Sequence, residues 1–370
     1  YPPMEKEGWY KVFNTAKEWG LNHLRFHSWC PPEAAFAVAD ELGFYLQVEL
    51  PAWTLTIGTD YQTTDFLYAE AKRIIKEYGN HPSFVMWSMG NELQGDMTVL
   101  HKMVDSLKVI DRRHLYSNTA FTFEKGHGDS PEYNDDFFIT QWTKNGWVRG
   151  QGVFNDYSPS FDNNYELAVR DINVPIITHE IGQYAVYPNI EEIDKYSGVL
   201  DPLNFKAVKD DLDKKGLIDK AKEYTLASGK LAALLYKEEI ERALKTKGIS
   251  GFQLLDLHDF PGQGTALVGL LDAFWDNKGI ISAEEFRMHS SSIVPLMNFP
   301  KATYKNNEMF VGDIGVSNYS GEVLNNQKIS WSISDDKKEE KAKGFFYVDL
   351  ILGYNAGLGK IEYDLSGIKK

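Results

Sequence analysis

Apolar and polar positions follow two different spacings over the first 298 residues. Residues 8–20 carry apolar side chains at helical intervals, and the segment ends at Gly20, which is a helix stop signal. Residues 83–89 and 174–178 are nearly continuous apolar runs, which are typical of strands buried in a parallel sheet. Because such runs alternate with helical segments, the pattern predicts repeated strand–helix units, the signature of an α/β fold.

Seven strands are predicted in this part of the chain, at 24–27, 44–50, 83–89, 115–119, 137–142, 174–178 and 249–257. Helices are predicted at 8–20, 32–42, 66–78, 97–110, 165–171, 231–246 and 283–296, with a long excursion at 182–225. A (β/α)8 TIM barrel needs eight strands of this spacing. We therefore expect a TIM barrel whose first strand lies upstream of Tyr1, so that the chain is a piece of a longer protein.

From residue 299 the pattern changes to alternating, turn-rich β segments, at 309–318, 329–333 and 345–350. These segments predict a partial, immunoglobulin-like β-sandwich. The domain organisation expected is thus a barrel over 1–298 and a sandwich segment over 299–370. Charged residues at 335–341 fall between two β segments, where they predict a solvated hairpin tip.

The net charge limits which classes of binding partner are expected, and the cysteine content excludes an internal disulfide. The net charge of −14 offers no general attraction to nucleic acid or to anionic membranes, so neither is expected as a partner. No apolar run of about 18 residues is present to span a bilayer. The single cysteine, Cys30, can form no internal disulfide, and the compartment is not readable from it.

Two glutamates occupy the ends of predicted strands, where TIM barrels build their active sites. Glu92 follows the strand at 83–89, and Glu180 follows the strand at 174–178. One protonated and one ionised carboxyl group in one pocket are what glycoside hydrolysis requires, and a separation of about 5–5.5 Å implies retention of configuration. The alternative is a pair of structural carboxylates. No His-x-His pair or carboxylate cluster has the spacing of a metal site, so no metal is expected.

The surroundings of both glutamates are similar to one known family. Residues 83–92 (SFVMWSMGNE) resemble the acid/base motif of glycoside hydrolase family 2, the β-galactosidase and β-glucuronidase family, and residues 177–182 (ITHEIG) resemble its nucleophile motif. Residues 20–27 and 39–49 resemble its second strand and the approach to its third. The resemblance covers 1 to about 298. It implies that N-terminal β domains precede the barrel and are partners of this chain.

Carried over residue by residue, the resemblance makes Glu92 the general acid/base and Glu180 the nucleophile. Asn91 would then bind the 2-hydroxyl of the sugar. A cation such as Arg25 would keep Glu180 ionised. Substrate-binding roles are also expected for Arg25, His27 and His179. The alternative is an ordinary barrel salt bridge for Arg25 and a structural role for each histidine.

At the predicted eighth barrel strand the sequence departs from better-known members of the family. Those members carry a Trp beneath the sugar in a Trp-Asn-Phe-x-Asp-Phe stretch, whereas residues 255–260 read Leu-Asp-Leu-His-Asp-Phe. Trp275 or Trp142 could supply the aromatic face instead. Asp256 and His258 could contact polar sugar substituents, and the glycine-rich residues 262–265 predict a turn beside the pocket.

The activity expected is that of a retaining, exo-acting β-glycosidase of the β-galactosidase type, with an oligosaccharide or glycoconjugate as substrate and no cofactor. A β-glucuronide or β-galacturonide is the rival substrate, although an Asn-x-Lys sugar-acid signature is not evident in the expected loop. A barrel that binds carbohydrate without turnover is the competing class. The resemblance favours a periplasmic or secreted location.

Overall fold

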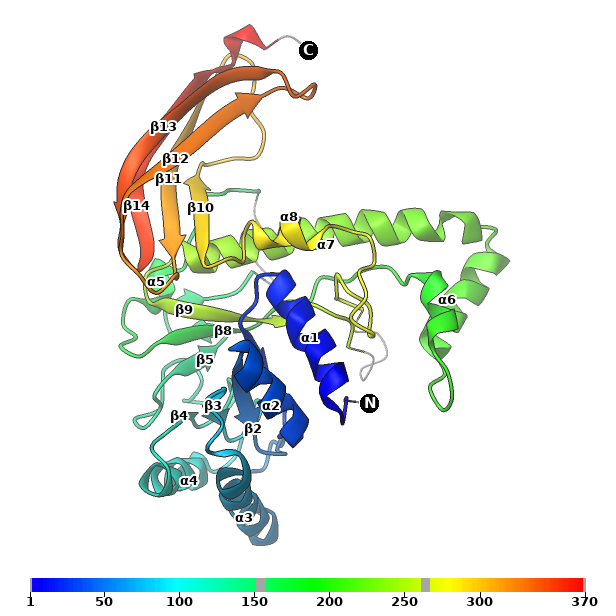
Figure 1. The fold of residues 1–370 in the computed structure, drawn as a ribbon, viewed down its shortest axis with the longest axis vertical. Helices are drawn as coiled ribbons and strands as arrows, with labels where there is room; N and C mark the ends of the chain where they lie inside the picture. Colours follow the sequence, from blue (N-terminus) through cyan, green and yellow to red (C-terminus); the bar gives the residue numbers. More distant parts are fainter. Residues whose placement is uncertain (1, 151–157, 261–266, 369–370) are drawn as a thin grey trace.

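Seven parallel strands form the barrel wall in the computed structural model, which describes residues 2–150, 158–260 and 267–368 (Figure 1). Four strands pair in the order β1 (His23–Arg25), β2 (Tyr45–Glu49), β3 (Phe84–Ser88) and β4 (Leu115–Ser117). Three more pair in the order β5 (Phe138–Thr140), β8 (Ile176–Gly182) and β9 (Ile249–Leu255). The seven strands predicted from the sequence are confirmed within the described residues.

The two groups of strands are joined at the loop that follows β4. The backbone N–H of Phe121 donates to the carbonyl of Ile139 at 3.1 Å, and Asn91 bridges to Ala120. These contacts continue the wall from β3 and β4 to β5. They bring the ends of β3 and β8 to the same side of the barrel.

Helices connect the strands, as the alternating pattern predicted. They are α1 (Lys6–Glu18), α2 (Glu33–Leu42), α3 (Tyr61–Tyr78), α4 (Met97–Ile110), α5 (Glu166–Val169), α6 (Leu203–Lys214), α7 (Ala221–Leu244) and α8 (Ala283–Arg287). Local sequence explains several boundaries. Helix α3 begins at 61 rather than at 66 because the Asp60 side chain accepts hydrogen bonds from two backbone N–H groups of its first turn. Helix α2 ends where Gly43 adopts a left-handed conformation with φ of 63°.

The barrel core is built from the apolar faces of these helices and from alternate strand residues. Phe13 of α1, Phe36 of α2 and Trp87 of β3 are fully buried in it. A second cluster, around Tyr236 of α7, packs against β8 and β9. Tyr236 also explains why residue 182 is a glycine, because a Cβ built there would lie 2.0 Å from the tyrosine ring.

The long excursion contains its own helices. Residues 182–225 include the short 3-10 helices η1 (Ile190–Lys195) and η2 (Ile218–Lys220) and the whole of α6. Helix α7 begins ten residues before the helix predicted at 231–246. Figure 1 shows α6 at the far end of the long α7 helix, away from the barrel strands. No helix in the described part of the chain is long and apolar enough to cross a membrane.

Two predicted elements are wrong in part. The helix predicted at 283–296 ends with α8 at Arg287, and residues from Ile293 onward form strand β10 (Ile293–Asn298). The strand predicted at 137–142 ends with β5 at Thr140, and Trp142 belongs to a small hairpin, β6 (Trp142–Thr143) and β7 (Gly146–Trp147).

The C-terminal strands stand at one end of the molecule, across α7 from the barrel (Figure 1). Strands β10, β11 (Met309–Asn318) and β14 (Gly353–Asp364) form an antiparallel sheet, and β12 (Leu324–Ser334) pairs with β13 (Glu340–Leu350). The chain ends in a 3-10 helix, η4 (Leu365–Gly367), before the last described residue. The charged residues 335–339 form the turn between β12 and β13, which confirms the predicted hairpin tip.

Candidate active site

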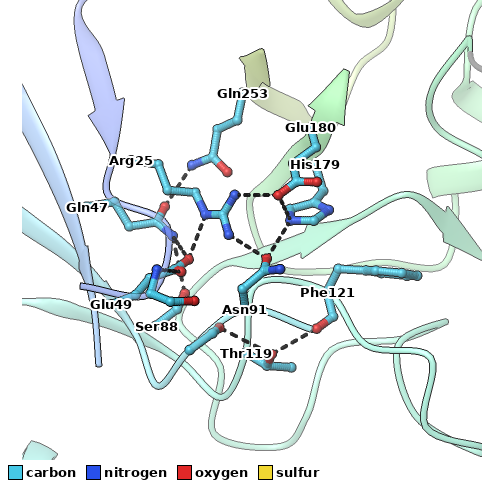
Figure 2. A network of polar contacts seen from close by, with 12 residues as sticks. Arg25, Gln47, Glu49, Ser88, Asn91, Thr119, Phe121, His179, Glu180 and Gln253 are labelled. Atoms are coloured by element: carbon cyan, nitrogen blue, oxygen red, sulfur yellow. Dashed lines mark hydrogen bonds and ion pairs between the residues drawn. The ribbon is translucent and has the colours of Figure 1, made fainter. Parts of the chain in front are cut away.

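Arg25 organises the polar residues at the carboxyl ends of the strands (Figure 2). It lies on β1, and its side chain is 8% exposed. Its Nε donates to Glu49 at 2.6 Å, its Nη1 to Glu180 at 3.0 Å and its Nη2 to Asn91 at 2.5 Å. One guanidinium group thus joins side chains from β2, from the end of β3 and from β8. The expectation that Arg25 contacts Glu180 is met by this geometry.

The two predicted glutamates face each other. Glu92 follows β3 and Glu180 lies within β8, and an oxygen of each lies within 4.8 Å of the other. Both residues have left-handed backbone angles, with φ of 48° for Glu92 and 49° for Glu180. Such angles are strained for a residue with a Cβ and cluster at functional sites. The separation is close to that of enzymes in which the second carboxylate attacks the sugar directly.

The surroundings of the two carboxyl groups move their pKa values in opposite directions. Partial burial and the negative charge of Glu180 raise the pKa of Glu92 to about 7, although Arg25 opposes this shift. Burial alone would raise the pKa of Glu180, but the Arg25 guanidinium group that donates to it holds the pKa low, at about 2. Near neutral pH, therefore, one group can donate a proton while the other is an anion.

His179 is completely buried beside the nucleophile candidate. Its Nε2 lies 3.2 Å from Oδ1 of Asn91 and 3.4 Å from Oε1 of Glu180, and its Nδ1 lies 3.1 Å from Nε2 of Gln141. Burial lowers the pKa of His179 to about 3, so the ring is neutral at physiological pH. Of its two predicted roles, a direct contact with substrate is disfavoured by this burial.

Glu92, His179 and Glu180 are the one group of such side chains, among the described residues, that is compact enough to hold a metal ion. Their contacts do not fit one. Both ring nitrogens of His179 already have partners, and Arg25 donates to Oε1 of Glu180. A metal cation there would be repelled by the guanidinium group that already pairs with Glu180.

A cavity of about 820 Å³ opens beside Glu180. Residues from β1, β9 and the loops after them line it, and five predicted substrate-binding residues are among them: Arg25, His27, Asp256, His258 and Trp275. His258 stacks on Trp275 with ring centres 4.4 Å apart and lies 3.3 Å from Asp256. Burial would lower the pKa of His258, but the Asp256 carboxylate raises it above its ordinary value. This wall therefore presents an aromatic ring and a histidine whose protonated form is favoured by the adjacent carboxylate.

The predicted residue Trp142 lies on another side of the site. Its ring meets Phe121 edge-on, with centres 4.4 Å apart, and Phe121 in turn packs 5.7 Å from the ring of His179. Trp147 and Phe123 complete this aromatic cluster. Trp142 is thus placed near the glutamate pair, but it is not among the residues lining the cavity beside Glu180. The predicted turn at 262–265 lies outside the described residues.

Three residues of the site were not predicted. Gln141 lies between Glu92, at 3.5 Å, and His179, at 3.1 Å. Glu49 holds Arg25, and Trp53, whose side chain is largely exposed, meets His27 edge-on at 5.7 Å. Glu49 and Gln141 both stand at strand ends, so their positions carried the same signal that identified the two glutamates.

Comparison with known proteins agrees with this geometry. Residues 6–186 match the family model described as "Glycosyl hydrolases family 2, TIM barrel domain", and residues 308–370 match a "Domain of unknown function (DUF8488)". Two curated proteins of Formosa agariphila, each named "Putative beta-glucuronidase", are similar in sequence. One is 31% identical over 110 residues, covering 29% of this chain and 10% of the relative, and the other is 26% identical over 160 residues, covering 41% and 19%.

Solved structures share the fold at low sequence identity. A β-D-mannosidase from Dictyoglomus thermophilum aligns with a TM-score of 0.61 at 14% identity, over 98% of this chain and 46% of its own. A β-galacturonidase from Eisenbergiella tayi aligns with a TM-score of 0.51 at 15% identity, over 78% of this chain and 48% of its own. The chain spans less than half the length of these relatives. The family model thus assigns residues 6–186, which include both glutamates, to the TIM barrel domain of glycoside hydrolase family 2.

Proposed function

We propose that the chain carries the active site of a retaining, exo-acting β-glycosidase. The observation that carries the proposal is the pair Glu92 and Glu180, whose carboxyl oxygens lie within 4.8 Å and whose pKa values are moved to about 7 and about 2. An inverting enzyme needs a wider separation, because a water molecule must fit between the sugar and the second carboxylate. A separation within 4.8 Å leaves no room for that water molecule.

In the first step, the Glu180 carboxylate attacks the anomeric carbon while protonated Glu92 gives its proton to the glycosidic oxygen. The bond to the leaving group breaks, and a covalent glycosyl ester forms on Glu180. In the second step, Glu92, now ionised, takes a proton from a water molecule, which attacks the same carbon and releases Glu180. Asn91, bonded to Arg25 and adjacent to Glu92, would bind the 2-hydroxyl of the sugar during both steps.

The substitution Glu180→Gln tests the nucleophile. We expect it to abolish turnover of aryl β-glycosides while leaving binding of the sugar product nearly unchanged. Glu191→Gln, at an exposed carboxylate on η1, is the matched control and should keep full activity. Equal hydrolysis by Glu180→Gln and the parent would overturn the assignment, and an inverted first product in an NMR time course would exclude retention.

For the sugar, we propose a neutral β-galactoside or an acidic β-glucuronide or β-galacturonide. The names of the curated relatives and of one solved neighbour support the uronides, and so does His258 on the cavity wall, whose protonated form Asp256 favours. A panel of 4-nitrophenyl β-glycosides separates these substrates. If the sugar carries a carboxylate, His258→Gln should reduce kcat/KM for the uronide about 10-fold more than for the galactoside. An equal effect on both would remove His258 from sugar recognition.

We also propose that a further parallel strand, from N-terminal sequence outside the chain, closes the barrel between β1 and β9. Supporting this, β1 and β9 are each the last strand of their sheet, and the cavity is lined by residues of both, including Leu24 and Leu254, and by Trp9 and Val12 of α1. The five C-terminal strands would belong to a β-sandwich domain. Extending the chain with its preceding coding sequence should raise both kcat/KM and melting temperature, whereas equal activity without the extension would contradict the proposal.

A further inference from the structure

A continuous line of hydrogen bonds connects Glu180 to Glu92. It passes through Arg25, Asn91, His179 and Gln141, in that order. Arg25 donates to Oδ1 of Asn91, and Nε2 of His179 lies 3.2 Å from the same oxygen. Nδ1 of His179 lies 3.1 Å from Nε2 of Gln141, which also lies 3.5 Å from Oε1 of Glu92. Asn91, His179 and Gln141 are all buried, so these contacts face little competition from solvent.

The chemistry of the groups determines which atom is the donor and which is the acceptor in each hydrogen bond of this line. A guanidinium group can only donate, so the atom of Asn91 that faces Arg25 must be its carbonyl oxygen. Because that oxygen is an acceptor, the Nε2 of His179 facing it must carry a proton. The ring is neutral, and its Nδ1 must then accept from the amide nitrogen of Gln141. Each orientation follows from the one before it.

The same polarity determines which atom of Asn91 is available for a ligand. With Oδ1 held by Arg25 and His179, the Nδ2 group points away from both of them. Asn91 immediately precedes Glu92, so a donor at this position is next to the reacting sugar. Without His179, one of the two restraints on the amide plane would be lost.

We propose that His179 is a positioning residue: held as its Nε2–H tautomer by Gln141, it fixes the Asn91 amide so that Nδ2 donates to the sugar 2-hydroxyl. The inference rests on the proposed glycosidase function. It assigns His179 an indirect role in place of the direct sugar contact considered from the sequence. Because the 2-hydroxyl contact strengthens in the transition state, the effect should appear mainly in kcat.

The decisive experiment pairs a substitution in the protein with a deletion in the substrate. We would compare 4-nitrophenyl β-D-galactopyranoside with its 2-deoxy analogue, and use the glucuronide pair if the protein prefers it. His179→Leu should lower kcat about 10–100-fold for the parent glycoside and by less than about 2-fold for the 2-deoxy analogue. His179→Gln, which retains an N–H donor, should recover a large part of the loss.

His114→Leu is a matched control because His114 is also buried but packs against Phe84 and Trp87 in the core. It should change the rates for the two substrates by the same factor. If His179→Leu also reduces both rates equally, the positioning role is wrong and the glycosidase proposal stands. If the parent protein hydrolyses neither series, the proposed function fails and the inference fails with it.

A spectroscopic measurement keeps the proposal falsifiable if His179→Leu does not fold. Long-range ¹H–¹⁵N correlations of the parent protein should show a protonated Nε2 and an unprotonated Nδ1 for His179. Gln141→Leu should weaken this preference and reduce kcat for the parent glycoside more than for the 2-deoxy analogue. A protonated Nδ1 in the parent protein would overturn the inference directly.

Discussion

The negative charge of Glu180 should control the acidity of Glu92, and Glu180→Gln removes that charge without changing the size of the side chain. Two unit charges 4.8 Å apart, which is the upper limit of the separation between the nearest carboxyl oxygens, interact by ~3.5 kcal/mol at an effective dielectric constant of about 20. This would correspond to a shift of ~2.5 pKa units. Arg25 contacts the same carboxylate and offsets part of the interaction. We therefore expect a smaller fall in the pKa of Glu92, of about 1–2 units.

The assay is a ¹³C NMR titration of the glutamate carboxyl groups in the two proteins. Burial is the larger of the two causes that raise the pKa of Glu92, so the value in Glu180→Gln should stay above the ordinary glutamate range. The exposed substitution Glu191→Gln should leave the titration of Glu92 unchanged. An unchanged pKa in Glu180→Gln would refute the claim that the two carboxyl groups are coupled.

Three further predictions follow from the same geometry. Because Glu92 must be protonated to act as an acid, kcat/KM should fall as the pH rises through about 7, and a flat profile to pH 9 would contradict its role. A carboxyl group whose pKa is raised on folding lowers the stability of the protein as the pH rises from about 4.5 to about 7. In urea melts, Glu92→Gln should therefore increase the free energy of unfolding by about 1–2 kcal/mol at pH 8 and leave it unchanged at pH 4. Equal stability changes at both pH values would argue against this. Gly182→Ala should lower the free energy of unfolding by about 2–4 kcal/mol, because the new Cβ would meet the Tyr236 ring. Gly198 also has a positive φ, but no atom of the described residues lies within 4 Å of the position that its Cβ would take, so Gly198→Ala should lower the free energy of unfolding by only about 1 kcal/mol in the same melts.

The positions of the two glutamates were predictable because local pattern determines them. Apolar runs at 83–89 and 174–178 identify the strands, and in a parallel barrel all strand ends meet at one face. Glu92 and Glu180 could therefore be brought together although they lie 88 positions apart in the sequence. The approximate bounds of most barrel helices followed from the same periodicity.

Other features depend on contacts between distant parts of the chain. Gln141 lies 38 positions from His179 and 49 from Glu92, and no local pattern indicates that it contacts either residue. The strand β10 was missed because its apolar residues also fit a helical repeat. In the structure Val294 and Leu296 are buried while Pro295 between them is exposed, which is the two-residue period of a strand. Pro295 itself argues against a helix interior.

The hydrogen bond between Arg25 and Glu180 spans 155 positions of the chain and joins the first group of barrel strands to the second. Closing so long a loop costs conformational entropy that no local contact repays, so this bond belongs to a late stage of folding. Until it forms, Glu180 lacks the guanidinium group that lowers its pKa in the folded site. A half-folded chain would thus lack the opposed pKa values of the two carboxyl groups, and chemical competence would coincide with completion of the wall rather than with the appearance of its separate strands.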